Sequence, residues 1–306
     1  MNKRIIGALL ALSALVAGCG NDKTETSTMS TQNTSNYPVT LNSGNHTTTV
    51  DAKPIRIVSL SPTATEDLFA INAGLQVIAV DSQSTYPANA PKTDLSGFTP
   101  NTEAVLNYKP DLVIAQMDAN GLVDALTKAN VDVLVQPSAT SIEDVYKQIA
   151  DLGAATDHNN EAQKLNGEMK TKIADNVKGV GDKARGKTYY HEVDNTYYSS
   201  TSSTFIGQIY NLFGLVNIAD AAAQNGNQYP QLSSEYIVEK NPDYIFLADS
   251  KCCAQNAQSV ASRPGWNTLG AVTANHVVAL DDDVASRWGP RVVDLVTTVG
   301  NAVQGH

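Results

Sequence analysis

Basic side chains are scarce in this sequence. Its 21 lysines and arginines stand against 31 aspartates and glutamates, which gives a formal net charge of -10. A protein that binds nucleic acid neutralises phosphates with a basic stripe, so this acidity argues against nucleic acid as a partner. The chain also has only three cysteines, Cys19, Cys252 and Cys253. These are too few for a small disulfide-stapled domain or for a four-cysteine zinc site.

The motifs of the common enzyme classes are absent as well. The sequence has no GxSxG nucleophile elbow, no GxxxxGK(S/T) phosphate loop and no HExxH metal motif. His191 and Glu192 are neighbours in a predicted strand, where consecutive side chains point to opposite faces, so we interpret them as a half-buried strand pair. We interpret Asp281–Asp283 as a solvated loop. Because no nucleophile and base are paired, we expect no enzyme, no bound metal and no cofactor.

The N-terminus is typical of an export signal. Lys3 and Arg4 precede an apolar run over residues 5–16, which is shorter than the roughly 20 residues needed to cross a bilayer. Small residues then lead to Cys19, as in the bacterial lipobox, whose cysteine is lipidated. We therefore expect a signal peptide over 1–18 and a lipid anchor on the extracytoplasmic face of the cell membrane. An ordinary signal peptide with a chance cysteine is the alternative.

After Cys19 the composition changes twice. Residues 19–36 are polar and nearly free of apolar side chains, which predicts a disordered tether. From residue 37 short apolar strands alternate with amphipathic helices, a pattern typical of a mainly parallel α/β sheet covered on both faces. A hairpin is predicted over 39–50, further strands at 55–60, 77–80, 112–115 and 131–135, and helices at 63–72, 122–129 and 142–152.

The second half of the chain repeats the first. Thr102-Glu103 precedes Lys-Pro-Asp and a buried strand at 112–115, and Ser234-Glu235 precedes Asn-Pro-Asp and a buried strand at 244–247. Such ordered matches predict two similar Rossmann-like α/β lobes. Their predicted ranges are 37–158 and 181–306, and the second lobe is predicted to hold strands at 187–193 and 276–280 and a helix at 290–299.

One long helix is predicted at the seam of this duplication. Between residues 161 and 177 the apolar side chains recur every three or four positions, which is the helical period. We assign 159–180 to a helix that connects the lobes, with an ordinary surface helix as the alternative. Because a single long helix bends less easily than several loop crossovers, no large hinge closure is expected.

Two segments carry a resemblance to a known family. RIVSLSPTATE at residues 56–66 and KPDLVI at 109–114, with the lipobox and the hairpin, resemble the helical-backbone (class III) substrate-binding proteins of ABC importers. The resemblance spans about 38–303. It implies two α/β lobes joined by one long helix, and a cobalamin, haem or ferric siderophore ligand in the cleft between them. It also implies an ABC permease dimer with its ATPase as the partner, and we expect a monomer.

The resemblance also implies roles for individual residues. Glu103 and Glu235 occupy the positions that dock into arginine pockets of the permease, although charge compensation at a helix N-terminus would also explain them. Ligand contacts should come from loops at the carboxyl ends of the strands. The candidates are Ser61, Tyr86, Phe98, Tyr197, Tyr198, Asp283, Arg287, Trp288 and Arg291.

The sequence ranks the ligands without choosing one. Tyr86-Pro87 resembles a Tyr-Pro of the cobalamin-binding members, and few arginines are offered for an anionic siderophore. Haem would need an axial tyrosine or histidine. Cobalamin is therefore placed first, ferric siderophore second and haem third. A surface-anchored chelatase or hydrolase, and an adhesin, remain as alternatives from other classes.

The adjacent Cys252 and Cys253 follow the strand at 244–247. The outer face of the membrane permits disulfides. We predict a vicinal disulfide there, with two free thiols in a loop as an equally weighted alternative.

Overall fold

The computed structural model describes residues 36–305 of the chain. The predicted signal peptide, the lipid anchor at Cys19 and all of the predicted tether except Asn36 lie outside the described residues. The described part opens with a hairpin of β1 (Val39–Ser43) and β2 (His46–Val50), paired antiparallel with Val39 opposite Val50. The Thr48 hydroxyl donates to the Val133 carbonyl oxygen at 2.6 Å, which ties the hairpin to the first lobe.

The first lobe is built on a five-stranded parallel sheet in the order β5-β4-β3-β6-β7. The central strands are fully buried and, apart from Ser59, apolar on both faces, as expected for a sheet covered on both sides. The strands are β3 (Ile57–Leu60), β4 (Val77–Asp81), β5 (Lys92–Leu95), β6 (Leu112–Ala115) and β7 (Asp132–Val135). The helices are α1 (Pro62–Ala70), α2 (Thr102–Leu106), α3 (Leu122–Lys128) and α4 (Ile142–Thr156).

The second lobe has a four-stranded parallel sheet in the order β11-β10-β8-β9. Its strands are β8 (Thr188–Glu192), β9 (Val216–Asn217), β10 (Tyr244–Leu247) and β11 (Val277–Ala279). Its helices are α6 (Phe205–Asn211), α7 (Ser234–Lys240), α8 (Ala257–Ala261), α9 (Gly270–Thr273), α10 (Asp282–Ala285) and α11 (Val292–Gln304).

The two sheets have the same topology. Apart from the extra edge strand β5, strands β3, β4, β6 and β7 lie in the same relative order as β8, β9, β10 and β11. The Pro-Asp motifs explain part of this likeness. Asp111 accepts hydrogen bonds from the backbone nitrogens of Ile55 and Arg56, and Asp243 accepts one from the backbone nitrogen of Thr188. Each aspartate thus anchors the start of the neighbouring strand, and the predicted two-lobe α/β fold is confirmed.

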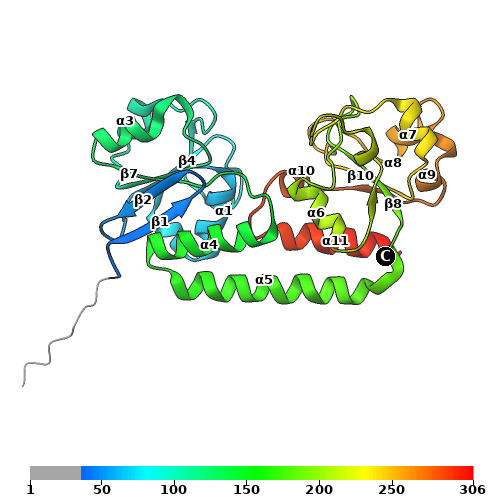
Figure 1. The fold of residues 1–306 in the computed structure, drawn as a ribbon. Helices are drawn as coiled ribbons and strands as arrows, with labels where there is room; N and C mark the ends of the chain where they lie inside the picture. The colour runs from blue at the N-terminus through cyan, green and yellow to red at the C-terminus, as the bar shows by residue number, and fades with distance from the viewer. Residues whose placement is uncertain (1–35, 306) are drawn as a thin grey trace, which may run out of the picture. The chain divides into compact units, whose positions relative to one another are not determined.

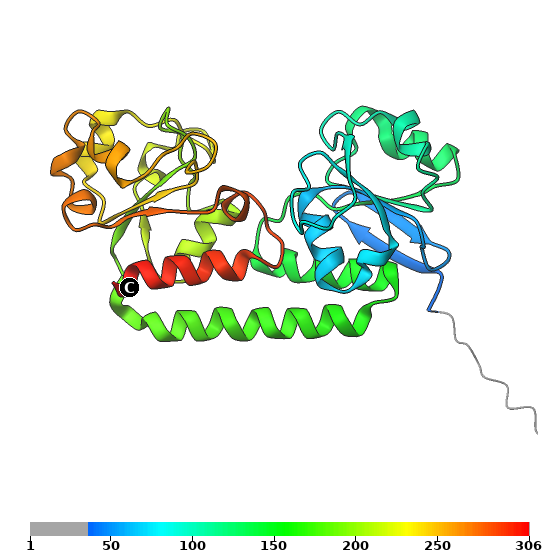
Figure 2. The ribbon, with the colours of Figure 1, turned by 180° about the vertical axis from the view of Figure 1, so that it is seen from behind.

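Helix α5 (Asn159–Val180) lies between the lobes in the chain. Its 22 residues span about 33 Å at 1.5 Å per residue. Both α4 and α11 pack along it, which Figures 1 and 2 show from opposite sides. Met169 and Ile173 of α5 belong to one hydrophobic core that reaches from Leu41 to Val303. The lobes are therefore joined by shared apolar packing as well as by the chain.

The elements that the sequence did not predict are short or polar. Strand β5 reads Lys-Thr-Asp-Leu and has no apolar run, but the Thr93 hydroxyl donates to the Val80 carbonyl oxygen at 2.7 Å and holds it on β4. Helix α1 begins at Pro62 because the Ser61 hydroxyl accepts from the Ala64 backbone nitrogen. Such local caps set element boundaries that apolar periodicity leaves open.

A cluster of ionisable groups is buried inside the second lobe. The Glu192 carboxylate is fully buried and receives two hydrogen bonds of 2.6 Å from the Arg263 guanidinium. Asp249 is fully buried beside it, and neither of its carboxylate oxygens has a hydrogen-bond partner of normal geometry among the described residues. Burial, followed by the nearby Glu192 charge, raises the pKa of Asp249 to about 7.

This raised pKa predicts a pH-dependent stability. Folding favours the protonated Asp249, so its stabilising effect is complete below the ordinary aspartate pKa and is lost as pH rises toward 7. The free energy of unfolding should fall by up to about 1.4 kcal/mol per pH unit between about pH 4 and 7 through this group. Asp249→Asn should remove that part of the slope in urea denaturation followed across this range. The exposed Asp175→Asn is the control and should keep the wild-type slope. An unchanged slope in Asp249→Asn would contradict the assignment.

Candidate ligand-binding cleft

Exposed apolar side chains gather at one edge of each sheet. Six of the nine large apolar side chains that are exposed in the described residues follow the carboxyl ends of strands. The other three, Ile55, Leu75 and Val216, lie at amino ends. The six are Tyr86, Phe98 and Met117 in the first lobe and Val193, Tyr198 and Tyr229 in the second. An apolar surface on the loop edge of both lobes is where an α/β protein binds its ligands.

A cleft of about 370 Å³ lies between residues of both lobes. Its first-lobe wall is the loop after β7, and its second-lobe wall comes from several loops and from α6. Its lining has aliphatic, aromatic, hydroxyl and amide side chains but no aspartate, glutamate, lysine or arginine. The lining residues are Ser138, Ala139, Thr140, His191, Val193, Ser200, Ser203, Thr204, Phe205, Ile206, Gln228, Tyr229, Ala248, Ala285, Ser286 and Trp288.

Trp288 is the one predicted ligand residue in this lining. Its indole is half-buried, and Nε1 donates a 3.0 Å hydrogen bond to Oε1 of Gln148 on α4. The ring also packs against the core that the lobes share. Trp288 therefore links the second lobe to the first lobe at the wall of the cleft.

His191 lines the cleft, although the sequence indicated only a strand residue paired with Glu192 and not a site residue. It lies near the end of β8, is only 2% exposed, and its Nδ1 is hydrogen-bonded to the Tyr210 hydroxyl at 2.8 Å. Burial lowers the pKa of His191 to about 4, so the ring is neutral near pH 7. Its neighbour Glu192 pairs with Arg263 in the lobe interior. The two side chains lie on opposite faces as predicted, with the cleft on the histidine side, but both are buried, so the prediction of a half-buried pair was wrong.

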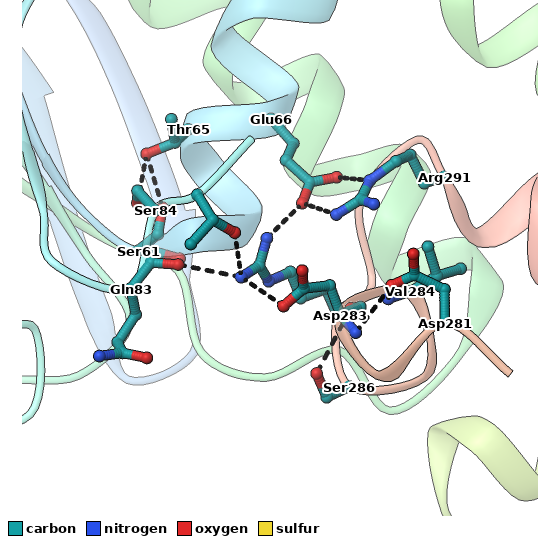
Figure 3. Close-up of polar contacts among 12 residues, drawn as sticks. Ser61, Thr65, Glu66, Gln83, Ser84, Asp281, Asp283, Val284, Ser286 and Arg291 are labelled. Atoms are coloured by element: carbon teal, nitrogen blue, oxygen red, sulfur yellow. Dashed lines mark hydrogen bonds and ion pairs between the residues drawn. The ribbon is translucent and has the colours of Figure 1, made fainter. Parts of the chain in front are cut away.

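An ion-pair cluster lies beside the cleft and joins the lobes. Glu66 on α1 has a side chain only 1% exposed, and it was not predicted as a site residue. Its Oε1 accepts from Arg287 Nη1 at 2.9 Å and from Arg291 Nη2 at 2.6 Å, and its Oε2 accepts from Arg291 Nε at 2.8 Å. Figure 3 shows the Glu66 carboxylate facing the Arg291 guanidinium. One first-lobe carboxylate therefore holds two second-lobe arginines.

The other contacts of these arginines involve predicted residues. Arg287 Nη2 donates to Asp283 Oδ1 at 3.0 Å and to the Gln83 carbonyl oxygen at 2.9 Å. The Arg291 guanidinium lies 4.4 Å from the ring centroid of Tyr86, within cation–π range. Tyr86, Asp283, Arg287 and Arg291 are thus brought together, but through contacts with one another and with Glu66. Their contact with a ligand stays a prediction.

The remaining predicted residues are scattered around the loop edges. Ser61 is buried and caps α1, so its hydroxyl is used within the first lobe. Tyr197 stacks on the buried Trp266 with ring centroids 5.7 Å apart. Phe98 and Tyr198 are exposed, at 64% and 39%, and neither lines the cleft. Their positions after strands did not reveal which of these residues would line the cleft and which would lie elsewhere on the loop edge.

Cys252 and Cys253 are free thiols in the structure, so the predicted vicinal disulfide is absent there. Adjacent Cα atoms are about 3.8 Å apart across a trans peptide, below the ~4.4–6.8 Å usual for disulfides, which disfavours such a bridge. The loop is held by Asp282, whose Oδ2 accepts from the backbone nitrogens of Lys251 and Cys252. Asp281 caps α10. The interpretation of Asp281–Asp283 as a merely solvated loop was therefore wrong.

Glu103 and Glu235 occupy equivalent places in the two lobes. Each is exposed in the first turn of a short helix, α2 or α7, and neither has an ion-pair partner among the described residues. Their docking role stays a prediction.

No group of three or more histidine, cysteine, aspartate or glutamate side chains between residues 36 and 305 could hold a metal ion. In the same part of the chain no helix has the length and apolarity to cross a membrane.

Known proteins provide the comparison for this fold and cleft. Residues 57–284 match the family described as periplasmic binding protein. The chain is 33% identical over 319 residues to YvrC of Bacillus subtilis, named as an ABC transporter substrate-binding lipoprotein, and the match covers 99% of this chain and 98% of that protein. It is also 33% identical over 277 residues to a cobalamin-binding protein of Halobacterium salinarum, covering 87% and 74%.

Solved structures show the same fold at low sequence identity. The periplasmic vitamin B12 binding protein BtuF of Vibrio cholerae superposes with a TM-score of 0.65 at 24% identity, over 82% of this chain and 97% of that one. The periplasmic heme-binding protein RhuT of Roseiflexus has a TM-score of 0.71 at 21% identity, over 82% and 98%. The prediction of a binding protein and not an enzyme is confirmed by these relatives. The chain therefore belongs to the periplasmic binding protein family and is a substrate-binding protein with two α/β lobes.

Proposed function

We propose that this protein is a lipid-anchored, extracytoplasmic substrate-binding protein that captures cobalamin and delivers it to an ABC permease. The observation that carries the ligand choice is the charge-free cleft, flanked by exposed apolar side chains on the loop edges of both lobes. Cyanocobalamin is a large corrinoid with a flat ring and no net charge, and the rim of the ring carries neutral amides. Its faces suit aromatic and aliphatic walls, and its amides suit hydroxyl and amide side chains.

The relatives support the same choice. Halobacterium salinarum has a cobalamin-binding protein at 33% identity, and vitamin B12-binding proteins of Pectobacterium and Vibrio match at 26–28%. Haem is the second candidate because His191, a neutral imidazole, lines the cleft, and imidazole is a common haem iron ligand. A ferric siderophore is third on this reading, because no cationic side chain lines the cleft.

Tryptophan fluorescence tests the ligand. Trp266 is fully buried in the second lobe and Trp288 lies at the cleft, so a bound corrin should quench Trp288. Titration of the purified protein with cyanocobalamin should give saturable quenching, and haemin and a ferric siderophore should bind more weakly. Trp288→Phe should lose most of the quenching, whereas Trp266→Phe should keep it. A saturating signal with haemin but not with cyanocobalamin would contradict the cobalamin assignment. Undiminished quenching in Trp288→Phe would contradict the placement of Trp288 at the bound ligand.

Glu103 and Glu235 are proposed to dock the protein on the permease. Their equivalent, exposed positions on two similar lobes suit a partner with two-fold symmetry. Glu103→Ala with Glu235→Ala should keep ligand binding and abolish uptake, because losing one partner of a buried interfacial charge pair costs about 2–5 kcal/mol. Complementation of uptake in cells measures this. Glu143→Ala with Glu168→Ala, two other exposed glutamates, is the matched control and should transport normally. Normal uptake by the Glu103/Glu235 variant would place the contacts elsewhere.

The anchor is proposed at Cys19. Cys19→Ala should leave an unlipidated precursor or release the protein, because a stable anchor needs more than one acyl chain and none could attach. Fractionation of cells, followed by intact-mass analysis, measures both outcomes. Membrane retention of Cys19→Ala at the wild-type level contradicts the proposal.

A further inference from the structure

The two arginines of the segment that supplies Ser286 and Trp288 to the cleft are both paired with protein carboxylates. Ser286 and Trp288 line the cleft, and Arg287 between them points to Glu66 on the other lobe. The Arg287 and Arg291 side chains are only 10% and 18% exposed. An oxyanion on a ligand would have to replace Glu66 to reach either guanidinium.

Glu66 is the carboxylate that matters most in this arrangement. It contacts both arginines and is buried, whereas Asp283 contacts only one of them, Arg287, and is 36% exposed. Lys251 also pairs with Asp283 at 3.6 Å and with Asp281 at 2.7 Å. Three carboxylates, Glu66, Asp281 and Asp283, therefore face three cations, Arg287, Arg291 and Lys251, so their charges balance. The neighbouring Asp67 adds little negative charge, because burial, followed by the charge of Glu66, raises its pKa well above the usual range.

From this geometry we propose that Glu66 determines the ligand selectivity of the cleft. By neutralising Arg287 and Arg291 it keeps the cleft wall uncharged, which favours a neutral macrocyclic chelate and excludes a polyanionic one. This inference rests on the proposed function and adds the residue that enforces it.

The physical basis is a competition between carboxylates. A buried, hydrogen-bonded ion pair is costly to break, because the partner left behind is a buried, uncompensated charge. A trianionic ligand approaching the wild-type wall would meet arginines already paired and two carboxylates that repel it. Without the Glu66 charge the same wall would offer two guanidinium groups to one carboxylate, and guanidinium binds oxyanions through strong, charge-assisted hydrogen bonds.

The test compares two chelates on two proteins. The probes are cyanocobalamin, which is neutral, and the iron(III) complex of a tris-catecholate, which is trianionic. Glu66→Gln keeps the side-chain shape and one oxygen acceptor but removes the charge. It should bind the tris-catecholate about tenfold more tightly than the wild type, the effect of one charge-assisted hydrogen bond, with an affinity that falls as salt rises. Its affinity for cyanocobalamin should change less than about threefold.

Two further variants separate charge from structure. Glu168→Gln removes the same charge from an exposed position on α5 and should leave both affinities unchanged. Glu66→Gln combined with Arg291→Gln restores the charge balance and should lose the gained anion affinity. A double variant that keeps this gain would overturn the role of the Arg291 charge. An equal gain in Glu168→Gln would overturn the local role of Glu66, because it would show that losing any carboxylate is enough.

The wild-type protein provides a test that needs no substitution. Tight, salt-sensitive binding of the iron(III) tris-catecholate to the wild type would overturn the selectivity proposal, even if Glu66→Gln failed to fold. Cyanocobalamin binding by the wild type is a separate measurement. If the wild type does not bind cyanocobalamin, the cobalamin assignment is wrong. If it binds cyanocobalamin normally, but folded Glu66→Gln binds the tris-catecholate no more tightly than the wild type, only the role of Glu66 is wrong.

Discussion

The packing of α4 and α11 along α5 is the constraint on which the rest of the structure depends. Neither lobe has a core of its own on this side, because the apolar residues of all three helices merge into one cluster. Each sheet keeps a separate smaller cluster on its other face. A shared core is stiff, since close-packed interiors do not deform continuously. The loop edges of the two sheets are therefore held in a defined relation, and a cleft can exist between them.

Polar contacts between the lobes add to the shared core in fixing where one lobe lies against the other. Trp288 reaches Gln148, and the Arg287 and Arg291 side chains reach Glu66, so the segment between α10 and α11 is tied to α1 and α4. This segment supplies the side chains that contact the first lobe, and it also forms part of the cleft wall. The same few residues thus join the lobes and hold the Trp288 indole in the wall of the cleft. A large change at one of these residues should disturb both the packing of the lobes and ligand binding. A variant that keeps the side-chain shape and changes only its charge is therefore more informative, because it leaves the packing nearly unchanged.

The second lobe concentrates its ionisable groups in its interior. Glu192 and Asp249 lie near a single arginine, Arg263, and His191 faces the cleft from the same strand as Glu192. Burial acts on these groups in opposite directions: the pKa of the aspartate rises to about 7 and the pKa of the histidine falls to about 4, so both tend toward the neutral form. His191, the one of these groups that lines the cleft, therefore adds no charge to it at neutral pH.

The sequence by itself determined the longer and more apolar elements and their repetition. Apolar runs marked the buried strands, three-and-four spacing marked α5, and the paired Pro-Asp motifs marked the duplication because each aspartate anchors a strand start in its own lobe. These are local signals, and local signals survive in a linear pattern. The sequence also indicated, through its resemblance to the family, that residues 283–291 belong to the candidate ligand site.

What only the tertiary structure decided is which residues meet. Glu66 lies 221 and 225 residues from Arg287 and Arg291, and no periodicity or spacing connects them. Ser61 looked equivalent to other loop residues until its hydroxyl was seen to cap α1, and His191 looked like an ordinary strand residue until its face proved to be the cleft side. Such pairings depend on how two lobes dock on a common helix. That docking is a sum of many apolar contacts across the whole chain, and so no short stretch of sequence records it.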